Sequence, residues 1–176
     1  MAKDSFRSYY QTPEGFDDMV MESDGLFLTA LSFIHDTKEA GLEKKARDLP
    51  VFRQTKAWLD SYFKKAPLPD MPPLKPDRST PFRGLISDLM ACIPYGESVT
   101  YGELAVQAAK ILGKEKMSAQ AVGQAVGHNP LCILIPCHRV LGAGGALTGY
   151  GGGLENKRQL LSLEEIPFKD TGRQKR

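Results

Sequence analysis

The chain of 176 residues has no long apolar run. None of its hydrophobic stretches approaches the ~20 residues that a membrane-spanning helix needs, so we expect no membrane segment. Met1 to Asp4 carry charge early and no apolar stretch follows them, so no signal peptide is expected. With 41% hydrophobic and 25% charged residues, the composition is typical of a globular protein.

Cysteine is scarce and unevenly placed. The three cysteines are Cys92, Cys132 and Cys137, so residues 1–91 contain none. An odd number of cysteines does not suit a disulfide framework, and a reducing cytoplasm is the expected compartment. The apolar neighbours of Cys92 and Cys132 predict buried thiols. Because His35 has no cysteine or second histidine at ligand spacing, we predict no metal site there.

A large excess of charge of one sign is also missing. The net charge is only +2, with −1 in residues 1–80 and +3 in residues 81–176. Any nucleic-acid binding is therefore expected in the second half, with few phosphate contacts. The basic tail at 171–176 is predicted to be a solvated extension.

Proline, by contrast, is concentrated in one place. Six prolines fall within residues 66–81, which predicts an extended connector because proline interrupts helices and interior strands. We therefore expect an N-terminal domain at 1–78 and a C-terminal domain at 79–170. The first is predicted to be a small antiparallel sheet that carries a helix. Its expected elements are strands at 8–11 and 27–34 and a helix over 51–65.

The second half predicts short helices. An apolar helical face covers residues 81–92. Thr100 and Glu103 match a capping box at the start of the next helix, and Gly113 is a suitable stop. Ser118 can cap another helix after a polar turn. Two short helices joined by a tight turn indicate a helix-turn-helix.

The second helix of this pair has side chains suited to a groove. Its inward face is predicted to be apolar, with Ala119, Val122 and Val126. Its outward side is predicted to be small or uncharged, with Gln120, Ala121, Gln124 and Ala125. Small side chains let a helix approach a nucleic-acid groove closely, and glutamine can meet base edges or sugars. The expected DNA contacts are Ser118, Gln120, Ala121 and Gln124.

The most informative segment is residues 129–140, Asn-Pro-Leu-Cys-Ile-Leu-Ile-Pro-Cys-His-Arg-Val. Its apolar run at 133–135 predicts a short buried strand, which Pro136 ends because it has no N–H to donate. Cys137 follows where the chain leaves the core. The adjacent imidazole and guanidinium can favour a thiolate. A lone Cys-His pair is nevertheless a weak signal, since most single cysteines are small core residues.

Together with the glycine-rich run at 149–153 and Lys157, this segment resembles the active-site signature of the O6-alkylguanine-DNA alkyltransferases. Those are DNA-repair proteins that carry an alkyl group away on one cysteine. The resemblance covers about residues 81–165. It implies an α+β fold, with a small ribonuclease-H-like N-terminal domain before a mainly helical domain that contains the helix-turn-helix. Some members hold zinc in the N-terminal domain, but no cysteine is available there in this chain.

The resemblance also implies the manner of action. The protein is expected to act once per molecule, without a cofactor, as a monomer on double-stranded DNA that it binds through the minor groove. The expected substrates are O6-alkylguanine and also O4-alkylthymine, presented as flipped-out bases.

The resemblance assigns roles to individual residues. Cys137 is the expected alkyl acceptor, and His138 takes the thiol proton, in this family through a water molecule. Glu164 is expected to orient that histidine, and Tyr101 to donate to the guanine ring. Arg139 is a further expected DNA contact, although we favour a role in bracing the structure. The remaining expected substrate contacts are the hinge residue Asn129, the Val140 carbonyl, Tyr150, Gly151, Gly152 and Lys157.

Two positions depart from the family pattern. Gln120 stands where the family has an intercalating arginine, and Cys132 stands where some members have a proline that lines the pocket. Two other functions remain open. A non-repairing sensor of alkylated DNA would lack the reactive cysteine, and a Cys-His hydrolase would need an oxyanion hole and a substrate cleft.

Overall fold

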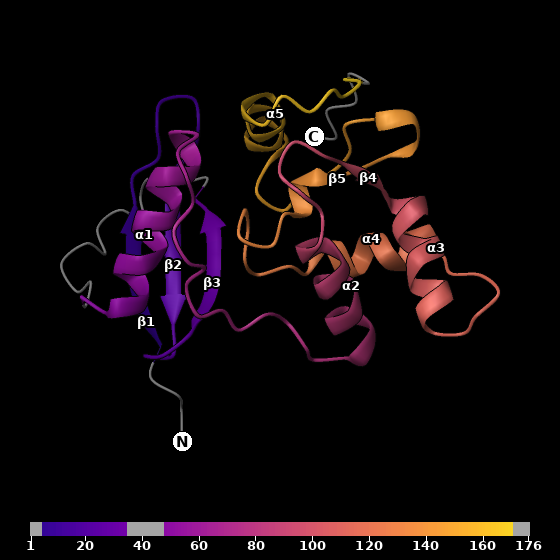
Figure 1. The fold of residues 1–176 in the computed structure, drawn as a ribbon, viewed down its shortest axis with the longest axis horizontal. Helices are drawn as coiled ribbons and strands as arrows, with labels where there is room; N and C mark the ends of the chain where they lie inside the picture. The colour runs from indigo at the N-terminus through magenta and orange to yellow at the C-terminus, as the bar shows by residue number, and fades with distance from the viewer. Residues whose placement is uncertain (1–4, 35–47, 171–176) are drawn as a thin grey trace. The chain divides into compact units, whose positions relative to one another are not determined.

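The computed structural model describes residues 5–34 and 48–170 of an α+β protein (Figure 1). His35 and the tail at 171–176 lie outside the described residues. The chain divides into two compact units. Unit 1 comprises Met1–Pro76 and Pro130–Cys132, and unit 2 comprises Asp77–Asn129 and Ile133–Arg176.

The described residues of unit 1 form a three-stranded antiparallel sheet with one helix. The strands β1 (Phe6–Tyr10), β2 (Met19–Ser23) and β3 (Leu28–Phe33) pair in the order of the chain. The small antiparallel sheet with a helix is confirmed. Strand β2 was not predicted, because Met19, Val20 and Met21 are apolar in succession and show no alternation, although the sheet buries only the two methionines among them.

Helix α1 (Pro50–Phe63) packs against this sheet (Figure 1). Proline at the first helical position suits the helix start, since its missing N–H would have no partner there. Trp58 and Tyr62 stack at 5.5 Å on the buried face. The Tyr10 hydroxyl donates to Asp60 of α1 at 2.9 Å. Each large aromatic side chain removed from water contributes about 1.5–3 kcal/mol, so this face holds the unit together.

Two proline-containing segments pair with β3. The amide of Leu28 donates to the Pro73 carbonyl at 2.8 Å, and that of Leu31 donates to the Pro130 carbonyl at 2.8 Å. Proline cannot donate to a ladder but its carbonyl can accept, so such segments suit the edge of a sheet. Part of the proline-rich connector thus belongs to unit 1, where Leu74 forms a bridge with Leu28 of β3.

The described part of unit 2 contains four α-helices, short 3-10 turns and a two-stranded parallel pair. Its elements are α2 (Pro81–Ala91), β4 (Val99–Thr100), α3 (Tyr101–Ile111), α4 (Ala119–Gly127), β5 (Val140–Leu141) and α5 (Leu154–Leu163). The capping box at Thr100 and Glu103 has both of its hydrogen bonds, and Ser118 accepts from two amides of α4. Helices α2, α3 and α4 pack on one another. Within the described ranges, no helix is long and apolar enough to span a membrane.

Two expectations about local structure were wrong. The apolar run Ile133–Ile135 is buried, but it forms a turn instead of a strand, and Ile133 has a φ of 68°. A short apolar run shows burial without distinguishing a strand from a turn, and the flanking prolines leave few amides for a ladder. Cys92 is exposed, because it is the C-cap residue of α2 and lies past the buried face of that helix.

Candidate active site

The parallel pair β4–β5 brings two distant parts of unit 2 together. Val99 pairs with Val140, and Thr100 pairs with Leu141. Tyr101 begins α3 directly after β4, and the 3-10 turn Cys137–Arg139 directly precedes β5. Because the two strands are parallel, Tyr101 leaves β4 at the end opposite to the one where the thiol turn enters β5, so the pairing joins the two segments but does not by itself set the phenol beside the thiol. Besides burial, the charge of an ionised Cys137 raises the pKa of Tyr101, which shows that the predicted phenol donor lies close to the predicted acceptor thiol.

The Cys137 thiol is buried and receives a hydrogen bond. The Asn129 amide nitrogen lies 3.0 Å from the Cys137 sulfur and 2.8 Å from the Ile135 carbonyl oxygen. Asn129 follows the C-cap of α4, so its side chain joins the end of this helix to the turn that carries the thiol. An N–H donor aimed at sulfur favours the thiolate over the thiol.

The Glu164 carboxylate is the centre of a buried polar cluster. His138 Nε2 lies 2.7 Å from Glu164 Oε1, and both side chains are fully buried. Arg139 donates to the same carboxylate from Nε at 2.7 Å and from Nη2 at 3.0 Å. The Gly96 amide adds a donor at 3.2 Å. With this many donors around it, the carboxylate is stabilised in its ionised form.

This arrangement determines which His138 nitrogen carries the proton. An ionised carboxylate only accepts, so Nε2 is the donor to Glu164 and Nδ1 keeps a lone pair. Among the described residues, none forms a hydrogen bond with Nδ1. Burial lowers the pKa of His138, while the hydrogen bond to Glu164 acts in the opposite direction. The ring is therefore a neutral base at neutral pH, with its accepting nitrogen available.

Lys157 is a fully buried cation on the inner face of α5. Its ammonium donates to the Val140 carbonyl at 2.7 Å and to the Thr148 carbonyl at 3.5 Å, and lies 5.8 Å from the centre of the Tyr150 ring. Burial lowers the pKa of Lys157 to about 8, and the charge of an ionised Cys137 acts in the opposite direction. Lys157 thus ties β5 to the segment that leads into the glycine-rich loop.

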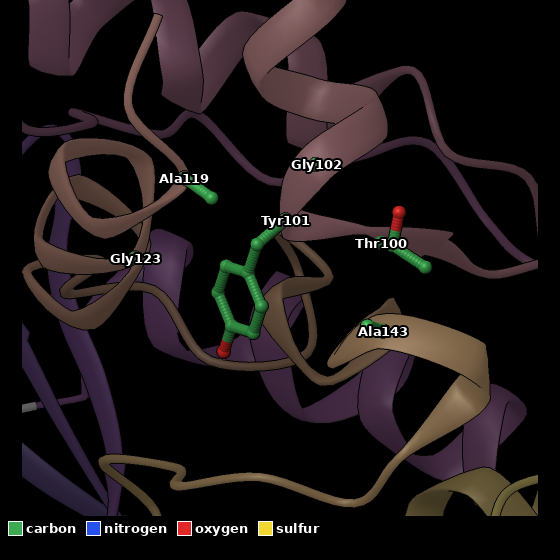
Figure 2. A pocket seen from close by; sticks show the side chains of 6 residues that line it. All are labelled: Thr100, Tyr101, Gly102, Ala119, Gly123 and Ala143. Atoms are coloured by element: carbon green, nitrogen blue, oxygen red, sulfur yellow. The ribbon is translucent and has the colours of Figure 1, made fainter.

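A hollow of about 390 Å³ opens beside Tyr101 (Figure 2). The phenol ring projects into it, between α4 and the turn at Ala143. A β-carbon at Gly123 would lie 3.7 Å from the Tyr101 ring, so a small residue there leaves room for the phenol. Burial raises the pKa of Tyr101, which keeps the phenol protonated and able to donate. The hollow is lined by Thr100, Tyr101, Gly102, Ala119, Gly123 and Ala143.

Helix α4 presents its two glutamines outward. Gln120 and Gln124 are exposed, and Val122 is buried, as the periodicity predicts. The predicted burial of two alanines was wrong. Ala125, predicted to face outward, is buried, and Ala119, predicted to face inward, is exposed and lines the hollow. The buried set at 122, 125 and 126 has helical i, i+3, i+4 spacing, which alanine fits as well as valine.

Ser118 and Arg139 are used within unit 2. The Ser118 hydroxyl accepts from the amides of Gln120 and Ala121 as the N-cap of α4, and the residue is exposed. Arg139 is buried, bonds Glu164 and the Ile93 carbonyl, and lies 5.7 Å from the Tyr95 ring. The guanidinium is turned inward, so its position favours the bracing role over a DNA contact.

Sequence reasoning missed two backbone groups of the Glu164 cluster and one side chain that holds the glycine-rich loop. The Ile93 carbonyl and the Gly96 amide bind Arg139 and Glu164 through their backbones, and no side-chain pattern marks them. Asn156 is buried and donates to the Gly152 carbonyl at 2.8 Å. Its only sequence signal is an amide side chain directly before Lys157, one turn into a helix that follows a glycine-rich run.

Sequence comparison identifies relatives over nearly the whole chain. The profile of the family described as 6-O-methylguanine DNA methyltransferase, DNA binding domain, matches residues 81–166. A methylated-DNA–protein-cysteine methyltransferase from Haemophilus influenzae is 40% identical over 169 residues, which are 95% of this chain and 90% of that protein. The chain belongs to the methylated-DNA–protein-cysteine methyltransferase family. The predicted family is thus confirmed.

Solved structures of this family share the fold. The crystal structure of Mycobacterium tuberculosis O6-methylguanine methyltransferase has a TM-score of 0.75 and 36% identity, over 92% of this chain and 93% of that chain. Mycobacterium tuberculosis OGT in complex with DNA has a TM-score of 0.74 and 35% identity, over 91% and 92% of the two chains. The α+β class and the membership among DNA-repair methyltransferases are therefore established.

Proposed function

We propose that this protein reverses alkylation damage by moving the alkyl group of O6-alkylguanine, and of O4-alkylthymine, from DNA onto Cys137. Each molecule acts once, as a cytoplasmic monomer without a cofactor. The observation that carries the proposal is the buried hydrogen bond between His138 and Glu164. His138 directly follows Cys137 in the sequence, and the Cys137 sulfur accepts an N–H from Asn129. A thiol needs such help, because at its ordinary pKa of about 8.5 only a few per cent is ionised near neutrality.

In the proposed reaction the thiol proton passes to His138 Nδ1, in this family through a water molecule. The Cys137 sulfur then attacks the alkyl carbon. The S–C bond forms, the C–O6 bond breaks, and its electron pair stays on the guanine, which takes up a proton. Glu164 stabilises the imidazolium that results, because its charge lies 2.7 Å from Nε2.

Tyr101 is the proposed donor to the departing guanine. Its raised pKa keeps the phenol protonated, and its ring projects into the hollow, near enough to Cys137 for the charge of the thiolate to act on the phenol. Such a donor neutralises the charge that develops on the base during transfer. The Val140 carbonyl, held by Lys157, is the proposed acceptor for the exocyclic amine of guanine, with Tyr150 as a wall.

Helices α3 and α4 are proposed to act as the helix-turn-helix that binds the minor groove. The exposed Gln120 and Gln124 and the small Ala121 are the proposed contacts. The small side chains of α4 permit a close approach to the sugar–phosphate edges. The damaged nucleotide must leave the stack to reach Cys137, which costs a few kcal/mol and less for a weakened pair.

The test is incubation with a duplex oligonucleotide that contains O6-methylguanine, followed by intact mass and peptide mapping. The proposal expects one methyl group per protein, on Cys137. Cys137→Ser should gain none yet bind the DNA about as well as the parent, and Cys92→Ser, which alters an exposed cysteine, should react like the parent. A methyl group on Cys92 or Cys132 contradicts the assignment. Binding without a mass change would indicate a damage sensor, and indifference to the DNA would favour a hydrolase.

A further inference from the structure

The glycine-rich loop is fixed on its entering side by the C-terminal segment of unit 2. The amide of Leu147 donates to the Lys169 carbonyl at 2.8 Å, and the amide of Lys169 donates to the Gly145 carbonyl at 2.8 Å. The Thr148 carbonyl then accepts from Lys157. The residues just before Gly149 are therefore held by hydrogen bonds to the C-terminal segment and to Lys157 before the loop begins.

The leaving side of the loop is held by a side chain. Asn156 lies in the first turn of α5, only 2% exposed, and its amide nitrogen donates to the Gly152 carbonyl at 2.8 Å. The N-cap of this helix is Gly153, with a φ of 86° and no side chain to offer. The amide of Gly153 turns back to the Tyr150 carbonyl at 3.0 Å. Asn156 thus secures the turn that contains Tyr150.

The part of the loop between these two attachments, which includes Tyr150 and Gly151, faces α4. A β-carbon on Gly151 would lie 4.0 Å from the carbonyl oxygen of Gly127, the last residue of α4. A shift of the leaving side would therefore move Tyr150 and Gly151 relative to the end of that helix. In the proposed function Tyr150 forms a wall of the site, so the position of this part of the loop would set the width of the site.

We propose that Asn156 is a positioning residue that latches the loop at Gly152 and thereby sets how closely the site surrounds the alkylated base. This inference rests on the proposed function. Asn156 touches no reacting atom in this scheme, and it acts through Tyr150 and Gly151. Releasing the latch should weaken binding of a base and leave the chemistry at Cys137 unchanged.

The test uses two variants that remove the donor in different ways. Asn156→Ala deletes the amide, and Asn156→Asp keeps its shape but, when ionised, presents only acceptor oxygens to the Gly152 carbonyl. The matched control is Gln159→Ala on the same helix, whose amide donates to Glu155 at 3.1 Å and not to a loop carbonyl. The probe is the free base O6-benzylguanine, which removes DNA binding from the measurement.

Loss of one hydrogen bond of ordinary strength changes an equilibrium about fivefold. Both Asn156 variants should therefore need about fivefold more O6-benzylguanine for half-maximal rate, while the limiting rate and the iodoacetamide reactivity of Cys137 stay within about twofold. Amide hydrogen exchange of a peptide covering residues 149–155 should accelerate in both variants and not in Gln159→Ala.

Unchanged half-saturation and unchanged exchange in both Asn156 variants would overturn the latch. A parent-like Asn156→Asp beside an impaired Asn156→Ala would also overturn it, because shape and not the donor would then matter. A parent protein that transfers no alkyl group refutes the proposed function instead, and hydrogen exchange then tests the latch by itself.

Discussion

Replacing Glu164 by glutamine keeps the shape of the side chain and removes its negative charge. Oε1 receives His138 and Arg139 Nη2, and Oε2 receives Arg139 Nε and the Gly96 amide. A glutamine has one oxygen and one NH2 group. Whichever way its amide turns, the nitrogen faces two donors, and the Arg139 guanidinium loses its buried counter-charge.

The size of the effect follows from this geometry. Removing one partner of a buried ion pair costs about 3–5 kcal/mol, because the other charge stays buried and uncompensated. A domain of ordinary stability has about 5–15 kcal/mol in all. The matched control is Glu155→Gln in the first turn of α5, the helix that Glu164 caps at its C-terminal end, because Glu155 pairs with Arg158 but its side chain is 64% exposed. Such a surface pair contributes about 0–1 kcal/mol.

The assay is urea denaturation of the parent and both variants at pH 7, followed by far-UV circular dichroism. We expect Glu164→Gln to lose several times more free energy of unfolding than Glu155→Gln. Cys137 of Glu164→Gln should also accept the alkyl group far more slowly, since the imidazolium of His138 would lack its counter-charge. Equal destabilisation by the two substitutions would refute the view of Glu164 as a buried, charge-compensated centre.

Three further predictions concern pH, salt and α4. The pKa of Lys157 is about 8 in the folded protein against 10.5 for an ordinary lysine, so between those values the unfolded chain binds more protons. The contribution of Lys157 to the free energy of unfolding should therefore rise with pH above about 8. Urea denaturation from pH 7 to 10 should show this rise in the parent and not in Lys157→Met. If the free energies of unfolding of the two proteins change in parallel with pH, the prediction is contradicted. Titration of duplex binding across salt concentrations should give a log–log slope of only a few units, since residues 81–176 carry a net +3, and a slope near about −8 would mean a larger basic surface. Gln120→Arg should raise the second-order repair rate on duplex DNA by the equivalent of ~1 kcal/mol, because arginine adds charge where a nucleotide leaves the stack. The gain should be smaller on single strands. A variant no faster than the parent on duplex would show that Gln120 already fills the gap.

Much of the fold could be predicted because its signals are local. The caps at Thr100 and Ser118 involve atoms two or three residues apart, so residue type and spacing predict them directly. Helix α1 shows its buried face through its own periodicity. Strand β2 and the turn at Ile133–Ile135 could not be predicted in this way, because burial against other segments decides their conformation.

By itself the sequence determined the helices and their caps, the family, and the cysteine motif that the proposed chemistry needs, since all of these depend on neighbouring residues. Only the tertiary structure decided what surrounds that motif. Glu164 binds His138 and Arg139 across more than twenty positions and the Gly96 amide across 68, and the β4–β5 pairing joins the segment that carries Tyr101 to the segment that carries the thiol turn. The reason is physical: contacts between residues distant in sequence form only when the core packs, and backbone partners such as Gly96 carry no side-chain signal.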